Sequence, residues 1–197
     1  MYREQGKKAR FIIPTGNLGN GVACYWAREM GFPIEKIALA LNANRALYNY
    51  SQGDDWAPAQ SLPTLANAMD VGNPSNFARL SHLLPKRDEW LKITDVVSAS
   101  DQNIRDTIID VFNTHAYEIC PHTATAYYTK QKLKWDHAIC VATAHPAKFD
   151  TIVEPLINQS VALPSALKDL LTLPGKKTDI PVDLSHLASV LKPRQND

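Results

Sequence analysis

The sequence has few cysteines, and its histidines are not spaced as metal ligands usually are. Only three cysteines occur, Cys24, Cys120 and Cys140, and they lie far apart in the chain. An odd number of widely spaced cysteines gives no sign of a disulfide framework or of a CxxC zinc site. The histidines show no HxxxH pattern, so we expect no metal centre. A cytoplasmic, reducing compartment fits this cysteine usage best.

Long apolar runs and an excess of charge of one sign are also absent. No apolar run reaches the roughly 18 residues that a membrane span needs. Residues 1–8 are polar and lack the apolar stretch of a signal peptide. Lysine and arginine number 21 against 20 acidic residues, which gives a formal net charge of +1. Phosphate backbones and anionic lipids would not attract such a chain strongly, so we expect no nucleic acid and no membrane among its partners.

The composition that remains is that of a globular protein. The chain has 197 residues, of which 45% are hydrophobic. This is enough to bury a substantial core in one large domain, or in one domain with a small appendage. We find no internal repeat, no low-complexity segment and no clear linker along the sequence.

Short apolar runs alternate with a helical pattern, as is typical of a parallel sheet. Residues 11–13 predict a buried strand, residues 22–30 carry apolar side chains at helical spacing, and residues 37–41 form a second apolar run. A strand, loop, helix and strand in this order make a βαβ unit. Residues 138–142 predict a third strand. The fold class that we expect is therefore α/β, with an open, mostly parallel sheet flanked by helices.

The middle of the chain is less regular. Residues 50–75 predict a long irregular segment, and a loop of that length inside a domain is often functional. A helix is expected to begin near Pro74. Residues 93–97 predict either a strand or the entry to a helix, and Ser100 is a suitable N-cap for the amphipathic helix that follows.

Two prolines mark the last third of the chain. Pro146 is well placed to open a helix after the third strand, and we expect Pro155 to interrupt that helix. From residue 163 onward the sequence predicts further amphipathic helices with a break at residues 173–175. We therefore divide the chain into an α/β domain over residues 1–160 and a helical extension over residues 161–197 that packs on it.

The segment Pro14-Thr15-Gly16-Asn17-Leu18-Gly19-Asn20, between the first strand and the helix, has the features of a phosphate-binding loop. Such a loop directs several backbone N–H groups, with the positive end of a helix dipole, at one point. No Lys-Ser/Thr follows, so it is not a nucleotide P-loop, and it lacks the GxGxxG of dinucleotide-binding proteins. The alternative is a glycine-rich turn that only joins strand to helix.

Several motifs in one order make the sequence resemble the carboxyl-terminal half of threonine synthase. The likeness runs from about Phe11 to about Leu170, and it is carried by PTGNLGN with the following GVACYWAREMGFPI and IALALNAN, TLANAMDVGNPSNFARL at 64–80, PHTATAYY at 121–128 and ATAHPAKFD at 142–150.

This resemblance implies a pyridoxal 5′-phosphate enzyme of the tryptophan-synthase-β fold type, or fold type II. Such an enzyme converts O-phospho-L-homoserine and water to L-threonine and phosphate. It further implies a cytoplasmic lyase of amino-acid biosynthesis, in which the cofactor phosphate is held by Gly16, Asn17, Leu18, Gly19 and Asn20. Thr143 would face the pyridine nitrogen, because a neutral hydroxyl can bond to that nitrogen without keeping it protonated. The alternative for Thr143 is an N-cap role before Pro146.

Other polar residues of the motifs have both functional and structural interpretations. Ser75 and Asn76 lie where a helix is expected to start, and they either approach the substrate or cap that helix. His122 and Thr123 also lie at an expected helix start, where capping and packing are favoured over catalysis. His145 either lines the cofactor pocket or is a hydrogen-bonded structural residue.

The family's chemistry also needs a lysine that forms a Schiff base with the cofactor. In the family it lies in an FKD-like context upstream of the phosphate loop, and no lysine of this sequence has that context. We therefore expect no catalytic residue in this chain and no activity of the chain alone. We also expect the sheet to be incomplete because the amino-terminal half is absent, and we expect that half to be a partner. The alternatives are a non-catalytic module that binds phosphate or pyridoxal phosphate, and another fold type II enzyme such as threonine dehydratase.

Overall fold

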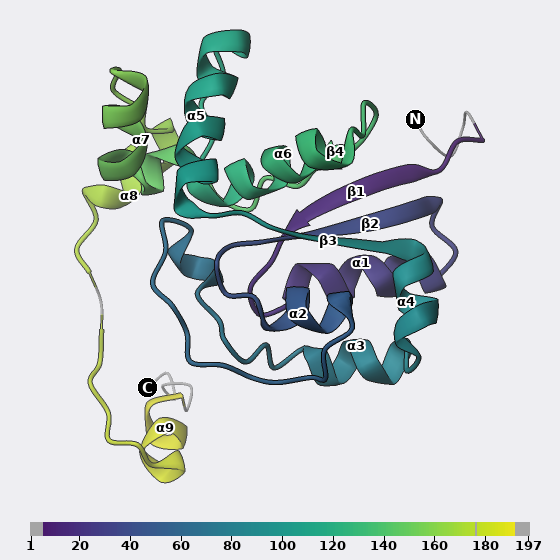
Figure 1. Cartoon of the computed structure of the whole chain (residues 1–197). Helices are drawn as coiled ribbons and strands as arrows, with labels where there is room; N and C mark the ends of the chain where they lie inside the picture. Colours follow the sequence, from purple (N-terminus) through teal and green to yellow (C-terminus); the bar gives the residue numbers. More distant parts are fainter. Residues whose placement is uncertain (1–5, 176, 192–197) are drawn as a thin grey trace. The chain divides into compact units, whose positions relative to one another are not determined.

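The computed structural model describes residues 6–175 and 177–191 (Figure 1). The chain divides into two compact units, Met1–Ala162 and Leu163–Asp197. Among the described residues, the first unit contains every strand and all of the residues that we single out as site candidates. The described part of the second unit has two short helices and is treated separately below.

A four-stranded, all-parallel sheet is the centre of the first unit. Its strands are β1 (Ala9–Pro14), β2 (Ile34–Leu41), β3 (Thr94–Ser98) and β4 (Ile139–Cys140), in the order β3-β2-β1-β4. The α/β class and the parallel sheet predicted from the sequence are confirmed. The predicted strand at 138–142 is shorter than expected, because only Phe11 and Ile12 of β1 pair with it before the chain turns away into the loop that contains Thr143.

Alternation along the strands divides the apolar residues between the two faces of the sheet. On one face, Ile13, Leu39 and Leu41 pack with helices α1 (Gly19–Glu29), α2 (Ala46–Gln52), α3 (Phe77–Leu83) and α4 (Arg87–Ile93). On the other face, Ile12 and the small residues Ala38 and Ala40 pack against α6 (Pro121–Leu133), as Figure 1 shows. The alanines allow α6 to lie close to the sheet.

Three buried side chains, joined by hydrogen bonds, fix α1 and α4 against β3. The indole Nε1 of Trp90 donates to the Tyr25 hydroxyl at 2.9 Å, and that hydroxyl lies 2.7 Å from Oγ1 of Thr94. All three side chains are almost completely buried. Burial raises the pKa of Tyr25 far above its ordinary value, so the phenol stays protonated and available as a donor.

A third hydrophobic cluster joins α5 (Asp101–His115) and α6 to α7 (Asp150–Ile157) and to the 3-10 turn η1 (Asn67–Met69). Ser100 caps α5 as predicted, with a capping box in which the Ser100 hydroxyl accepts from the Asn103 N–H. The predicted apolar stripe of α5 is buried at Ile104, Ile108 and Val111.

The expectation that Pro155 interrupts a helix is wrong, because Pro155 lies inside α7. It stands in the last turn of an eight-residue helix, where the missing N–H costs only one intrahelical bond. The buried side chains of Val153 and Ile157 hold the helix on the cluster. Pro146 opens a separate 3-10 turn, η2 (Pro146–Lys148), which precedes α7.

The irregular middle of the chain agrees with the prediction in its main part. Between the end of α2 at Gln52 and η1 no helix or strand occurs, and α3 begins at Phe77, three residues after Pro74. The ambiguous residues 93–97 form strand β3. Tyr50, Trp56 and Phe77 pack together, with the last two rings stacked at 3.5 Å.

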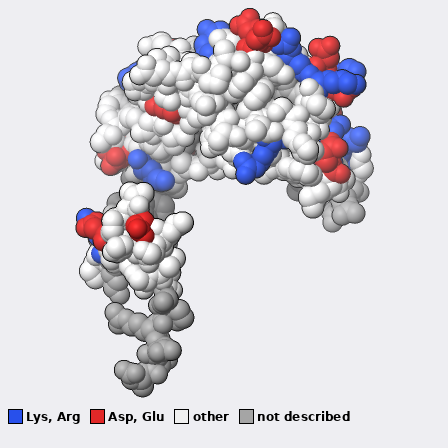
Figure 2. All heavy atoms as spheres, turned by 90° about the horizontal axis from the view of Figure 1, so that it is seen from below, with Lys and Arg blue, Asp and Glu red and all other residues white. Residues whose placement is uncertain are grey.

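The second unit contains α8 (Ser165–Leu171) and α9 (Leu184–Leu191), and neither helix has a buried residue. Our expectation that this extension packs on the α/β domain stays a prediction. Over the described residues, no helix has the length and apolar character needed to cross a membrane. Basic and acidic side chains are interspersed on the face that Figure 2 shows, in line with the near-zero net charge.

Candidate functional site

The loop after β1 leads directly into α1 and leaves the start of that helix open. Leu18, the N-cap residue, has a left-handed backbone with φ of 63°, and its side chain makes no capping hydrogen bond. The first N–H groups of a helix have no intrahelical acceptor. Because the Leu18 side chain is fully buried beneath the loop, the polar backbone is what the loop presents outward. An anion is the natural acceptor for such groups.

Two residues from a distant segment clamp the loop. The N–H and the hydroxyl of Ser75 both donate to Oδ1 of Asn17, at 2.6 and 3.0 Å. Nδ2 of Asn76 donates to the Asn17 carbonyl oxygen at 2.7 Å. Asn76 stands at the N-cap position of α3, but its side chain makes no capping bond there. Nδ2 of Asn76 thus bonds to the loop while its Oδ1 accepts from Arg79, and the capping interpretation of Asn76 is wrong.

Close backbone packing explains one of the two loop glycines. A Cβ on Gly16 would lie 2.6 Å from the Cα and 2.7 Å from the carbonyl oxygen of Met69, in η1. No side chain fits there, so glycine lets the loop lie directly on η1. Gly19 differs, because the nearest atom to its Cβ position, Nδ2 of Asn76, is 4.0 Å away.

A polar network at the end of β2 holds η1 in place. Nδ2 of Asn42 donates to Thr64 and to the Asp70 carboxylate, at 2.9 and 2.8 Å, and the N–H of Thr64 donates to the other Asp70 oxygen at 3.0 Å. Nδ2 of Asn44 donates to the carbonyl oxygen of Leu62. The buried amides thus tie the irregular segment to the carboxyl edge of the sheet, beside the loop.

One cavity brings the predicted cofactor residues together. It has a volume of about 290 Å³, near the lower end of the range for small-molecule sites. Its lining includes the five residues expected to hold the cofactor phosphate, Gly16, Asn17, Leu18, Gly19 and Asn20, and also Thr143 from the segment after β4. It also includes residues that the sequence analysis did not assign to the site, among them His122, Lys148 and Phe149. Ser75 and Asn76 are not part of this lining.

His122 is a buried, neutral member of this wall. Its Nε2 accepts a hydrogen bond of 3.2 Å from the Ala68 N–H in η1, so the ring proton must be on Nδ1. Burial lowers the pKa of His122, and the Asp70 carboxylate opposes this shift. Nδ1 is buried and has no hydrogen-bond partner among the described residues. The capping expected for His122 is wrong, because the α6 cap is Cys120, whose Sγ accepts from the Thr123 N–H. The packing expected for it agrees with its burial and its ring contact with Phe149.

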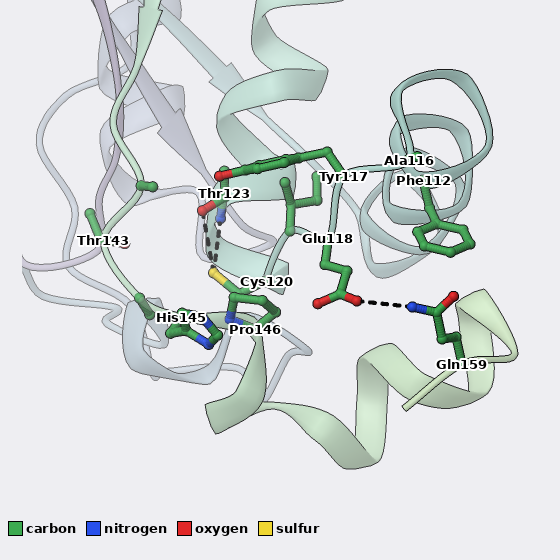
Figure 3. A pocket seen from close by; sticks show the side chains of 13 residues that line it. Phe112, Ala116, Tyr117, Glu118, Cys120, Thr123, Thr143, His145, Pro146 and Gln159 are labelled. Atoms are coloured by element: carbon green, nitrogen blue, oxygen red, sulfur yellow. Dashed lines mark hydrogen bonds between the residues drawn. The ribbon is translucent and has the colours of Figure 1, made fainter. Parts of the chain in front are cut away.

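Thr143 lies at the junction between this cavity and a larger one. The second cavity, about 720 Å³, is the one in Figure 3, and both cavities are lined by Thr143 and Ala144. The N-cap of η2 is His145, whose Nδ1 accepts from the Ala147 N–H at 3.1 Å. The capping alternative for Thr143 is therefore wrong, and its hydroxyl is left for another partner.

The larger cavity has several polar side chains in its lining. Glu118 reaches it from the segment between α5 and α6, and one of its carboxylate oxygens accepts from Nε2 of Gln159 at 3.3 Å (Figure 3). Cys120, Thr123 and His145 line the same space. Across residues 6–175 and 177–191, no group of three or more histidine, cysteine, aspartate or glutamate side chains is arranged to hold a metal ion.

The chain is similar to threonine synthases in sequence. The family model described as "Threonine synthase, C-terminal" matches residues 121–191. The chain is 35% identical to the threonine synthase of Haemophilus influenzae in an alignment that covers 97% of this chain and 45% of that protein. The chain thus spans about 45% of the length of the curated relatives that it matches.

The structure is also similar to threonine synthases. The crystal structure of the Escherichia coli enzyme matches 93% of this chain and 44% of its own, with a TM-score of 0.78 and 28% identity. A structure of threonine synthase from Brucella melitensis with bound pyridoxal phosphate matches 94% of this chain and 46% of its own. Its TM-score is 0.81 at 24% identity, which is evidence for the shared fold only.

Proposed function

The chain belongs to the threonine synthase family, and from this premise we propose that it forms the phosphate side of a pyridoxal phosphate site. The reaction at that site would be the conversion of O-phospho-L-homoserine and water to L-threonine and phosphate. The observation that carries the proposal is the single cavity lined by Gly16, Asn17, Leu18, Gly19, Asn20 and Thr143.

The residues present fit the phosphate end of this cofactor. The loop lies at the start of an 11-residue helix whose N-cap side chain makes no capping bond, so backbone donors remain for an anion. Gly16 lets the loop backbone approach η1 closely, where a side chain would push it outward. The buried His122 Nδ1 adds to the same wall an N–H donor that has no hydrogen-bond partner among the described residues.

Each residue of the chain has a distinct task in this proposal. The loop amides would bind and orient the phosphate, while Ser75 and Asn76 hold the loop through Asn17. The Thr143 hydroxyl would bond to the pyridine nitrogen, and as a neutral group it would not hold a proton there. When bound, the cofactor supplies an electron sink for chemistry at the substrate carbons. A direct role of Ser75 or Asn76 toward substrate stays a prediction.

We further propose that the reacting lysine and part of the substrate site come from the amino-terminal half of the family's fold. No lysine of this sequence has the FKD-like context of that residue. An apolar groove of about 460 Å³ beside β1 and β4, lined by Phe11, Phe32 and Ile139 among others, offers a surface for that half. We therefore expect no threonine from the chain alone.

Binding of a cofactor analogue without an aldehyde tests directly whether the loop holds the cofactor phosphate. Pyridoxine 5′-phosphate cannot react with lysines, so its calorimetric titration reports only non-covalent binding. We expect the 197-residue chain to bind it and to bind pyridoxine, which has no phosphate, at least about tenfold more weakly, because two or more hydrogen bonds to a charged group are lost. Equal affinity for the two compounds would show that the loop does not hold the phosphate.

The main alternative is a binding module that has no part in threonine formation. It is favoured only by the missing lysine context. To separate the two, the chain is mixed with the amino-terminal part of the Haemophilus influenzae relative, pyridoxal phosphate and O-phospho-L-homoserine. Threonine that forms only in the mixture supports the enzyme. Phosphate-ester binding with no threonine in the mixture favours the module.

A further inference from the structure

We infer that Lys148 supplies the positive charge that balances a phosphate monoester bound at the loop. This inference rests on the proposed function and adds a cation to a site that otherwise offers neutral donors. The ligand chemistry is that of a phosphate monoester dianion, from either the cofactor or the substrate.

The lining of the loop cavity contains one residue with a formal charge, which is Lys148. Every loop residue in that lining is uncharged, and Thr143 has only a hydroxyl. The only other ionisable side chain in this lining is His122, and its Nε2 accepts a hydrogen bond and is therefore unprotonated. A dianion placed there would meet helix-terminal amides worth roughly half an elementary charge, so most of its charge would stay unbalanced without a cation.

The backbone of Lys148 is held firmly at this wall. The Lys148 N–H donates to the His145 carbonyl oxygen at 3.1 Å within η2, and η2 is capped by the His145 side chain. The next residue, Phe149, packs its ring on that of His122 at 4.7 Å between centroids. The base of the lysine side chain is therefore placed beside the cavity, while its long stem leaves the ammonium free to reach a ligand.

Nothing else in the described part of the chain uses the Lys148 ammonium. It makes no salt bridge with a carboxylate of residues 6–175 or 177–191. The carboxylate that acts electrostatically on the same wall, Asp70, is already bonded to Asn42 and Thr64. A lysine that lines a cavity rich in N–H donors, without an anionic partner, fits a site for an anion.

Replacement of the charge tests the inference. Pyridoxine 5′-phosphate is titrated by calorimetry into the parent chain, Lys148→Met and Lys148→Arg, with Lys92→Met as a matched control. Lys92 is exposed on α4 and does not line the cavity. We expect Lys148→Met to weaken binding roughly tenfold, as for loss of a hydrogen bond to a charged group. The affinities of Lys148→Arg and Lys92→Met for pyridoxine 5′-phosphate should stay within about threefold of the parent's, because each variant keeps the cation at this wall.

A second titration separates the two sources of phosphate. O-phospho-L-homoserine is titrated into the same proteins when they are saturated with pyridoxine 5′-phosphate. Weaker binding of pyridoxine 5′-phosphate by Lys148→Met assigns the lysine to the cofactor phosphate. Weaker binding of O-phospho-L-homoserine alone assigns it to the substrate phosphate. If Lys148→Met binds both as the parent does, the inference is overturned. If the parent itself fails to bind pyridoxine 5′-phosphate, the proposed function fails instead.

Discussion

The contact between Gly16 and η1 predicts how the loop responds to one added methyl group. In Gly16→Ala the new Cβ would lie 2.6 to 2.8 Å from three backbone atoms of Met69. Carbon atoms in ordinary contact are about 3.5–4.0 Å apart, so loop and η1 must separate by about 1 Å. Neither side can relieve this by turning a side chain, because the obstructing atoms are backbone atoms.

The size of the effect follows from the cost of overpacking. Extra methyl groups in closely packed sites cost about 1–3 kcal/mol. For a protein of this length we expect the melting temperature to fall by about 2–10 °C. An outward shift of about 1 Å would also lengthen the hydrogen bonds from loop amides to a bound phosphate beyond their useful range. We expect the affinity for pyridoxine 5′-phosphate to fall at least about tenfold.

Gly19→Ala is the matched control for stability. The Cβ position of Gly19 is 4.0 Å from its nearest neighbour, and Gly19 is the first residue of α1. Alanine there should leave the melting temperature unchanged or raise it slightly, since alanine favours the helix by up to about 1 kcal/mol. Differential scanning calorimetry of the two variants makes the comparison. If Gly16→Ala melts with the parent and with Gly19→Ala, the loop does not rest on η1 as described.

Three further predictions concern stability. The pKa of His122 is lower in the folded than in the unfolded chain, so the unfolded chain binds a proton more readily. The contribution of His122 to the unfolding free energy is therefore present above pH 6.5 and is lost as the pH falls below that value. Melting temperatures from pH 7.5 to 5 should show this loss, and His122→Gln, which stays neutral, should reduce it. Ser100→Ala removes the α5 cap and should lower the unfolding free energy by about 1 kcal/mol in urea titrations. Tyr25→Phe leaves the Trp90 indole N–H and the Thr94 hydroxyl without their buried partner, so we expect a loss of about 1–3 kcal/mol in the same assay. An unchanged urea midpoint in Tyr25→Phe would show that water or a neighbour replaces the hydroxyl.

Local features of the sequence were enough to predict most of the sheet and the loop. Apolar runs, a glycine-rich turn and a helical pattern follow one another within residues 9–41, so the βαβ unit could be predicted from neighbouring residues alone. Ser100 could also be assigned as an N-cap, because a cap acts within three or four residues of its own helix.

Contacts between distant segments could not be predicted in the same way. Ser75 lies 58 residues from Asn17, and His122 lies 54 residues from Ala68, and no periodicity in one sequence indicates either pair. For Asn76 and Thr143, capping stood as the alternative to a role in the site, because a cap is the commonest local partner of such residues. The expectation for Pro155 was wrong because the sequence did not show that the helix begins at Asp150 and places Pro155 in its last turn.

The hold of Ser75 and Asn76 on Asn17 has a consequence for the speed of ligand capture. Both acceptor oxygens of Asn17 are engaged by Ser75 and Asn76, which directly precede α3. Because these hydrogen bonds join groups of the protein to one another, they hold the loop in its receiving shape independently of a phosphate, and little conformational freedom remains to be lost on association. Capture should then proceed as a single-step encounter, with an observed rate that rises linearly with ligand concentration and shows no plateau from a slow rearrangement.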